Sequence, residues 1–172
     1  MKKTAIKSWQ NESYTTSLLV TQTPKEVFDA IINVRGWWTQ SIAGITDKPG
    51  AEFLQYYRDV HITKLKIAEF IPGKKVVWLV TDSYFNFTRD ESEWKGTKIC
   101  FEILRKDNQT QLLFTHLGLV PEHECYDVCN NAWTNLIQLS LSNLITKGKG
   151  QPDKKENDFN PTNDRRWKLS GS

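Results

Sequence analysis

The stretch AWTNLIQLSLSNLITKGKGQP, residues 132–152, begins as an apolar helical pattern and ends in glycines and charged residues. The helical pattern starts upstream, at about Glu124, and runs to Lys147. A surface helix that packs by one face needs an apolar stripe of only about 100°. The pattern therefore predicts a long helix near the end of the chain that other elements grip on more than one side. On a helical wheel the apolar residues cover more than half a turn: Val128, Cys129, Ala132, Trp133, Leu136, Ile137, Leu139, Leu141 and Leu144.

The first third of the chain predicts one strand followed by two short helices. Residues 14–20, YTTSLLV, are rich in the β-branched and aromatic types that favour a strand. Residues 23–26, TPKE, form a capping box with proline at the first helical position, which marks the start of a helix. Residues 35–50 are interrupted by Gly and Pro, so they predict only a short helix or turn that carries Trp37 and Trp38.

Beyond residue 50 the apolar residues follow the period of strands. The segments between these strands are short and rich in turn residues, so we expect neighbouring strands to pair antiparallel. Together with the strand at the start of the chain, they predict an α+β fold. In this fold a curved six-stranded antiparallel sheet wraps around the long C-terminal helix, with two short helices after the first strand. The five predicted strands cover residues 51–57, 60–70, 74–82, 97–105 and 111–119.

The 172 residues suit one domain with one core. We expect an N-terminal extension over residues 1–13, the domain over residues 14–150 and a tail over residues 151–172. The tail has two Pro, mixed charge and few apolar residues, so the composition predicts a solvated or partly disordered segment. Phe159 and Trp167 are the only anchors that we expect it to use.

The charge distribution argues against a nucleic-acid partner. Residues 1–146 hold 16 Lys and Arg against 16 Asp and Glu, whereas residues 147–172 hold 7 against 4. A nucleic-acid-binding protein is expected to carry its basic stripe on the folded part. The small positive excess here belongs to the tail.

Neither a secretory signal nor a membrane span is predicted. The start MKKTAIKSWQNE has the lysines of a signal peptide but lacks the apolar stretch that must follow them. No segment approaches the roughly 20 apolar residues that span a bilayer. We therefore expect a cytoplasmic protein with no membrane insertion.

Three cysteines, an odd number, do not make a secreted disulfide framework. Cys125 and Cys129 are four residues apart, so they share one helix face, with His116 and His123 nearby in sequence. This spacing matches no closed zinc pattern and supplies no obvious fourth ligand. We interpret the cysteines as buried thiols and predict no metal site.

Several segments together resemble one family. TPKEVFDAI, GWW, GKKVVWLVTDS, EWKGTKICFEI, FTHLGLVPEHECYDVC and AWTNLIQLSLSNLITKGKG resemble the START-like (SRPBCC, Bet v 1-like) superfamily. Within it, the chain is similar to bacterial proteins that match the C-terminal domain of the activator of Hsp90 ATPase. The resemblance covers roughly residues 14–150, and none of its motifs is a catalytic signature. Its most specific residues are Thr115, His116, Gly118 to Pro121, Trp133, Ser140, Leu141 and Gly148 to Gly150.

The resemblance implies a helix-grip fold with a cavity for apolar molecules between the sheet and the long helix. Strand alternation predicts which side chains face this space. Large aromatic residues also fill ordinary cores, so core packing remains the alternative for each of them. The predicted ligand-binding residues are Trp37, Trp38, Phe53, Tyr57, Trp78, Phe101, Phe114, His116, Trp133 and Ile137.

Three residues are candidates for acid–base catalysis. His116 is expected to point inward from an apolar strand face, where an imidazole needs a hydrogen-bond partner. His61 is expected to face the same space, and Asp82 lies in phase with Trp78. A histidine near a carboxylate can act as an acid or a base, although a structurally satisfied histidine is the alternative. The sequence has no phosphate-binding glycine loop and no serine-hydrolase motif, so no cofactor is predicted.

Three functions follow as hypotheses. The leading one is a binding module that holds a small apolar or amphipathic molecule. The second is an enzyme of the cyclase or hydrolase kind, which requires a histidine or Asp82 in the cavity. The third is a chaperone partner, Hsp90, as for the eukaryotic activators, which also carry a separate Hsp90-binding domain.

Overall fold

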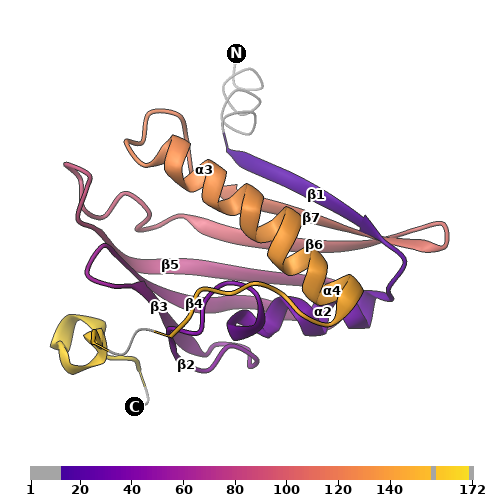
Figure 1. The fold of residues 1–172 in the computed structure, drawn as a ribbon, viewed down its shortest axis with the longest axis horizontal. Helices are drawn as coiled ribbons and strands as arrows, with labels where there is room; N and C mark the ends of the chain where they lie inside the picture. Colours follow the sequence, from indigo (N-terminus) through magenta and orange to yellow (C-terminus); the bar gives the residue numbers. More distant parts are fainter. Residues whose placement is uncertain (1–12, 156–157, 171–172) are drawn as a thin grey trace.

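Seven antiparallel strands form one sheet in the order β1-β7-β6-β5-β4-β3-β2 (Figure 1). The structure is a computed structural model and describes residues 13–155 and 158–170. Nearly all of the predicted N-terminal extension, residues 1–12, lies outside the described residues. The strands are β1 (Tyr14–Val20), β2 (Ile42–Gly44), β3 (Glu52–Tyr57), β4 (His61–Ile71), β5 (Lys75–Phe85), β6 (Lys98–Lys106) and β7 (Gln109–Leu117).

The predicted α+β helix-grip fold is confirmed, but the sheet has seven strands instead of six. The additional strand, β2, lies within residues 35–50, where Gly and Pro argued against a long helix or strand. It is only three residues long and pairs with β3, where Ala43 lies opposite Leu54. So short a strand leaves no period-2 signal in the sequence, because its pairing depends on β3.

Two helical segments follow β1, as predicted. Helix α2 (Pro24–Ile32) begins where the capping box predicted, and the Glu26 amide donates to the Thr23 hydroxyl at 3.1 Å. The 3-10 turn η1 (Val34–Gly36) then leads directly into Trp37 and Trp38. This turn places two indole rings side by side at the sheet's concave face.

The C-terminal helix runs without a break from Tyr126 to Lys147 and lies across the sheet (Figure 1). It consists of α3 (Tyr126–Asn135), a π-helical segment η2 (Leu136–Leu141) and α4 (Ser142–Lys147). The helix ends at Gly148, whose φ of 77° is a left-handed value that favours glycine. Across the part of the chain that the structure describes, no helix is long and apolar enough to cross a membrane.

The core lies between the concave face of the sheet and the helices. Alternation along the strands predicted its members correctly: Leu112, Phe114 and His116 are fully buried on β7. On β5, Val76, Trp78 and Val80 are buried in the same way. The core is therefore built mainly from large side chains of the central strands.

Part of the tail packs on the outer face of the sheet, although most of its described residues are exposed. Trp167 and Phe159, the two predicted anchors, join a second apolar cluster there. The Arg166 guanidinium donates two hydrogen bonds to Asp82, at 2.9 and 3.0 Å. The other members of this cluster are Leu54, Tyr56, Ile62, Ala43, Tyr84 and Leu169.

Candidate functional site

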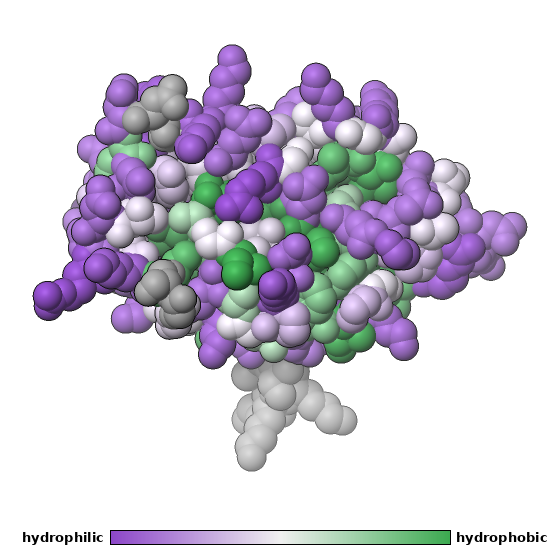
Figure 2. Space-filling view, turned by 90° about the horizontal axis from the view of Figure 1, so that it is seen from below, coloured by the Kyte–Doolittle hydropathy of each residue, from purple (hydrophilic) through white to green (hydrophobic). Residues whose placement is uncertain are grey.

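A pocket of about 540 Å³ lies between the C-terminal helix and the β3–β5 end of the sheet. This volume is within the range of known small-molecule sites. The face seen from below carries hydrophobic residues in its middle and hydrophilic residues around them (Figure 2). The described residues that line the pocket are Trp38, Gln55, Tyr57, Val60, His61, Phe85, Phe87, Trp94, Val128, Cys129, Ala132, Trp133, Asn135, Leu136, Leu139, Ser140, Gln151 and Asp153.

The sheet contributes a wall of three side chains in one row. Tyr57 lies opposite His61 across β3 and β4, and His61 lies opposite Phe85 across β4 and β5. The His61 ring stacks on Phe85, with centroids 4.3 Å apart and planes 25° apart. Neighbouring strands thus present one flat, mainly aromatic surface to the pocket.

A β-bulge in β5 decides which side chains of this strand point toward the pocket. Leu65 pairs with Val80 and Lys64 pairs with Asp82, so Thr81 is the extra residue. The bulge reverses the inward and outward alternation, which turns Asp82 to the outer face.

The prediction that Asp82 faces the cavity in phase with Trp78 is therefore wrong. Asp82 binds Arg166 instead. Although burial alone would raise the pKa of Asp82, hydrogen bonds from Arg166 and the Ser83 amide hold it below its usual value. The Asp82 carboxylate therefore binds the tail and does not take part in the pocket.

The loop after β5 forms the next part of the wall and is fixed to the start of the helix. It carries Phe87 and Trp94, which line the pocket. The Glu93 carboxylate accepts from the Glu124 and Cys125 amides at 2.7 and 3.1 Å. In return, the Glu124 carboxylate accepts from a loop amide at 3.1 Å. A buried carboxylate thus meets the free amides and the positive end of the helix dipole.

We expect Glu93→Ala to lower the free energy of unfolding by about 1 to 3 kcal/mol, because two amides lose a charged partner. Urea unfolding measures this loss. Glu91→Ala, an exposed residue of the same loop, is the matched control and is expected to change stability by less than about 0.5 kcal/mol. Equal effects of the two substitutions would contradict the anchoring role of Glu93.

The helix contributes an exposed apolar stripe to the pocket. Val128, Ala132, Leu136 and Leu139 succeed one another along this side of α3 and η2, and all four line the pocket. Val128 is 59% exposed and Leu139 is 58% exposed. Their apolar pattern predicted deep burial, but no described element covers them. Large apolar side chains left in contact with water mark binding surfaces.

The other side of the pocket is polar. Gln55, Asn135, Gln151 and Asp153 line it, and Asp153 is the one charged residue among the described residues of the wall. The segment that carries Gln151 is held in place because the Ser140 hydroxyl accepts from the Gln151 amide at 2.8 Å.

Glycine at position 150 makes this close approach possible. A Cβ there would lie 2.5 Å from the Gly36 carbonyl and 2.8 Å from the Ser140 carbonyl. The GKG motif that closes the predicted domain therefore positions part of the pocket wall.

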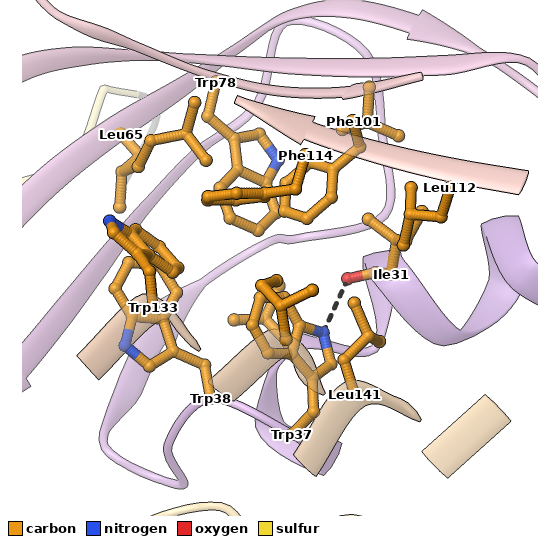
Figure 3. Packing of buried hydrophobic residues seen from close by; sticks show 14 of the residues in the cluster. Ile31, Trp37, Trp38, Leu65, Trp78, Phe101, Leu112, Phe114, Trp133 and Leu141 are labelled. Atoms are coloured by element: carbon orange, nitrogen blue, oxygen red, sulfur yellow. Dashed lines mark hydrogen bonds between the residues drawn. The ribbon is translucent and has the colours of Figure 1, made fainter. Parts of the chain in front are cut away.

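Three of the ten predicted ligand-binding residues line the pocket: Trp38, Tyr57 and Trp133. The other seven fill the core, where all are essentially inaccessible to solvent. Figure 3 shows four of them, Trp37, Trp78, Phe101 and Phe114, packed together. Trp37 stacks on Trp78 with centroids 6.4 Å apart, and its indole donates to the Ile31 carbonyl at 3.1 Å. The residues placed in the core are Trp37, Phe53, Trp78, Phe101, Phe114, His116 and Ile137.

His116 is a satisfied core histidine. Its Nδ1 accepts from the Trp133 indole at 3.0 Å, and its Nε2 lies 2.9 Å from the Thr97 hydroxyl. Because an indole only donates, His116 carries its proton on Nε2 and donates to Thr97. The Thr97 hydroxyl in turn donates to the Trp94 carbonyl at 2.6 Å. Burial lowers the pKa of His116 to about 3, so the ring is neutral.

His61 is the candidate catalytic residue that reaches the pocket. Its Nε2 lies 2.6 Å from the Thr63 hydroxyl, and its ring meets Trp94 edge to face at 4.8 Å. Burial lowers the pKa of His61 to about 3. At neutral pH it contributes an uncharged ring to the wall.

Cys125 and Cys129 are buried, and Cys129 touches the pocket. The hydrogen bond with Cys129 and burial both raise the pKa of the Cys125 thiol. A protonated thiol is a poor nucleophile and a poor metal ligand. Within residues 13–155 and 158–170, no group of three His, Cys, Asp or Glu side chains is arranged to hold a metal ion.

Sequence reasoning missed three aromatic residues of the wall, Phe85, Phe87 and Trp94, and the helix stripe. Phe85 ends β5 and Phe87 follows it in the loop, whereas the strand was expected to stop at Asp82. The stripe had a visible signal, since the apolar arc of the helix was wider than one packed face requires. The apolar residues beyond one packed face are those of the exposed stripe, which line the open pocket.

Comparisons with known proteins identify the fold. No protein-family model and no curated protein sequence matches the chain. Among solved structures, the Aha1 dimer from Colwellia psychrerythraea is 24% identical, with a TM-score of 0.64 over 80% of this chain and 98% of that chain. SSP2350 from Staphylococcus saprophyticus is 14% identical, with a TM-score of 0.56 over 81% of this chain and 95% of that chain.

DynU16, from the dynemicin biosynthetic locus, is 13% identical, with a TM-score of 0.61 over 87% of this chain and 57% of that chain. Identities this low show the fold alone. The chain thus shares the fold of these structures, which is the helix-grip fold that its sequence motifs predicted.

Proposed function

We propose that this chain, with its SRPBCC-type fold, is a binding protein that holds a small hydrophobic or amphipathic molecule in the pocket beside the C-terminal helix. The observation that carries the proposal is the combination of a pocket of about 540 Å³ with a mainly apolar, partly exposed wall. Exposing apolar area costs about 25 cal/mol per Å². A ligand that covers this wall recovers that free energy.

Binding fits the wall better than catalysis does. Asp82 lies on the outer face, and both hydrogen-bonding nitrogens of His116 are engaged in the core. His61 alone of the three candidates lines the pocket, as a neutral ring whose Nε2 is paired with the Thr63 hydroxyl. A general acid–base mechanism needs positioned partners for proton transfer.

The ligand can be identified by native mass spectrometry of the protein purified from its own host, followed by denaturation and analysis of the released small molecules. A co-purifying apolar compound would support the proposal and name its class. The binding site itself is tested by substitution.

We expect Ala132→Trp to weaken binding of the neutral fluorophore Nile red at least tenfold, because the indole fills the middle of the stripe. Ala132 is exposed on the helix, so stability should change by less than about 0.5 kcal/mol. Asn131→Trp, on the adjacent outward position, is the matched control and should bind Nile red like the unaltered protein. If both substituted proteins bind equally, the ligand site lies elsewhere.

A further inference from the structure

A row of buried polar side chains lies next to the aromatic wall of the pocket, on the same face of the sheet. Gln55 pairs with Thr63 across β3 and β4, and Thr63 pairs with Ser83 across β4 and β5. We call these three residues the polar row. It runs parallel to the row of Tyr57, His61 and Phe85. On each strand the two rows are two residues apart, so both face the same side of the sheet.

The polar row contains two atoms without a hydrogen-bond partner. They are Gln55 Oε1 and Ser83 Oγ, and both are buried. Gln55 is only 3% exposed, yet it lines the pocket. Leaving a buried polar group unpaired is costly, so such groups are rare in folded proteins. A ligand group that reaches Gln55 would satisfy this acceptor.

The charge of the wall restricts the ligand further. The described lining residues include no Lys or Arg, and their one charged member is the carboxylate-bearing Asp153. His61 is neutral, because burial lowers its pKa to about 3. An anionic head group would therefore lose its hydration without gaining a cationic partner.

We infer that the polar row is a head-group subsite, at which Gln55 selects an uncharged ligand with an apolar body and a hydroxyl-type hydrogen-bond donor. This inference rests on the proposed binding function. It goes further by naming the ligand class and the residue that distinguishes its members. The aromatic wall holds the body of the ligand, and the Gln55 amide oxygen accepts from its hydroxyl group.

The test compares naphthalene, 2-naphthol and 2-naphthoate by NMR titration of the full chain at pH 7. We expect 2-naphthol to bind about tenfold more tightly than naphthalene, which is the ratio that ~1.4 kcal/mol produces. We expect 2-naphthoate to bind more weakly than naphthalene. Binding of naphthalene tests the pocket, whereas the ratio of naphthol to naphthalene tests the subsite.

Gln55→Leu should abolish the preference for 2-naphthol, so that 2-naphthol and naphthalene bind with equal affinity. Gln111→Leu, the same substitution on β7 outside the pocket wall, should keep the preference. The midpoint of urea unfolding of the ligand-free Gln55→Leu protein should stay the same or rise, since an unpaired buried acceptor is removed. If Gln55 instead stabilised the fold through its own hydrogen bonds, the substitution would lower the urea midpoint.

Three results would overturn the subsite. They are equal affinities for naphthalene and 2-naphthol in the unaltered protein, a persisting preference in the Gln55→Leu protein, and tighter binding of 2-naphthoate. In each of these cases naphthalene still binds, so the pocket proposal survives. Absence of binding by all three compounds would overturn the pocket proposal together with the subsite.

Discussion

Replacing Trp133 with alanine is expected to lower the free energy of unfolding by about 3 to 5 kcal/mol, the range for large aromatic side chains in cores. The Trp133 ring is 1% exposed and touches Phe114 and Trp38, at centroid distances of 4.7 and 5.0 Å. It also stacks on Trp94 at 5.8 Å. Its removal opens a cavity where the helix meets the sheet. Urea unfolding measures the loss.

Trp133→Phe separates ring packing from the indole hydrogen bond. This substitution keeps an aromatic ring but leaves His116 Nδ1 buried without its donor. We expect it to cost about 1 to 3 kcal/mol, less than the alanine substitution. If the phenylalanine protein were as unstable as the alanine protein, the hydrogen bond, and not the packing, would dominate.

The second large effect is a loss of stability in weak acid caused by His116. Its pKa is about 3 in the folded protein, whereas an unfolded histidine titrates near 6.5. Between these values the unfolded chain takes up a proton that the folded chain does not. The contribution is therefore fully present above pH 6.5 and is lost as the pH falls toward 3. The expected loss from this residue is about 2 kcal/mol between pH 6.5 and 5.

Urea unfolding at these two pH values, with and without His116→Gln, measures this contribution, because the substituted protein lacks the titrating group. The difference between the two pH dependences should be about 2 kcal/mol. NMR titration of the imidazole gives an independent value. A ring that titrates near 6.5 in the folded protein would refute the assignment of His116 to the closed core.

The sequence predicted most of the fold because its periodicities are long and regular. Strand β1 begins and ends where the pattern placed it, at Tyr14–Val20, and helix α2 begins where the capping box predicted, at Pro24. The inward faces of β6 and β7 followed from simple alternation. The short strand β2 was missed because its pairing is set by a neighbour and not by its own residues.

The site was harder to predict, since it depends on local irregularity and on distant contacts. The bulge at Thr81 reverses the faces of β5, and no residue type in TDSYF marks it. Alternation therefore placed Asp82 inside and overlooked Phe85. Likewise, aromatic residues that fill the core and those that line a pocket look alike in sequence. Their distinction depends on where the helix leaves the sheet uncovered.

The π-helical segment η2 fits one more residue into a turn of the C-terminal helix than an α-helix holds. In it the Ser142 amide donates to the Ile137 carbonyl, five residues back instead of four. A helix absorbs one inserted residue in this way without breaking. Deleting one residue from η2 would restore the ordinary spacing and leave Trp133 and Ile145 facing as they do now. Helices with and without this extra residue would thus present the same faces to the sheet, so an alignment without a gap here would pair residues with unrelated surroundings.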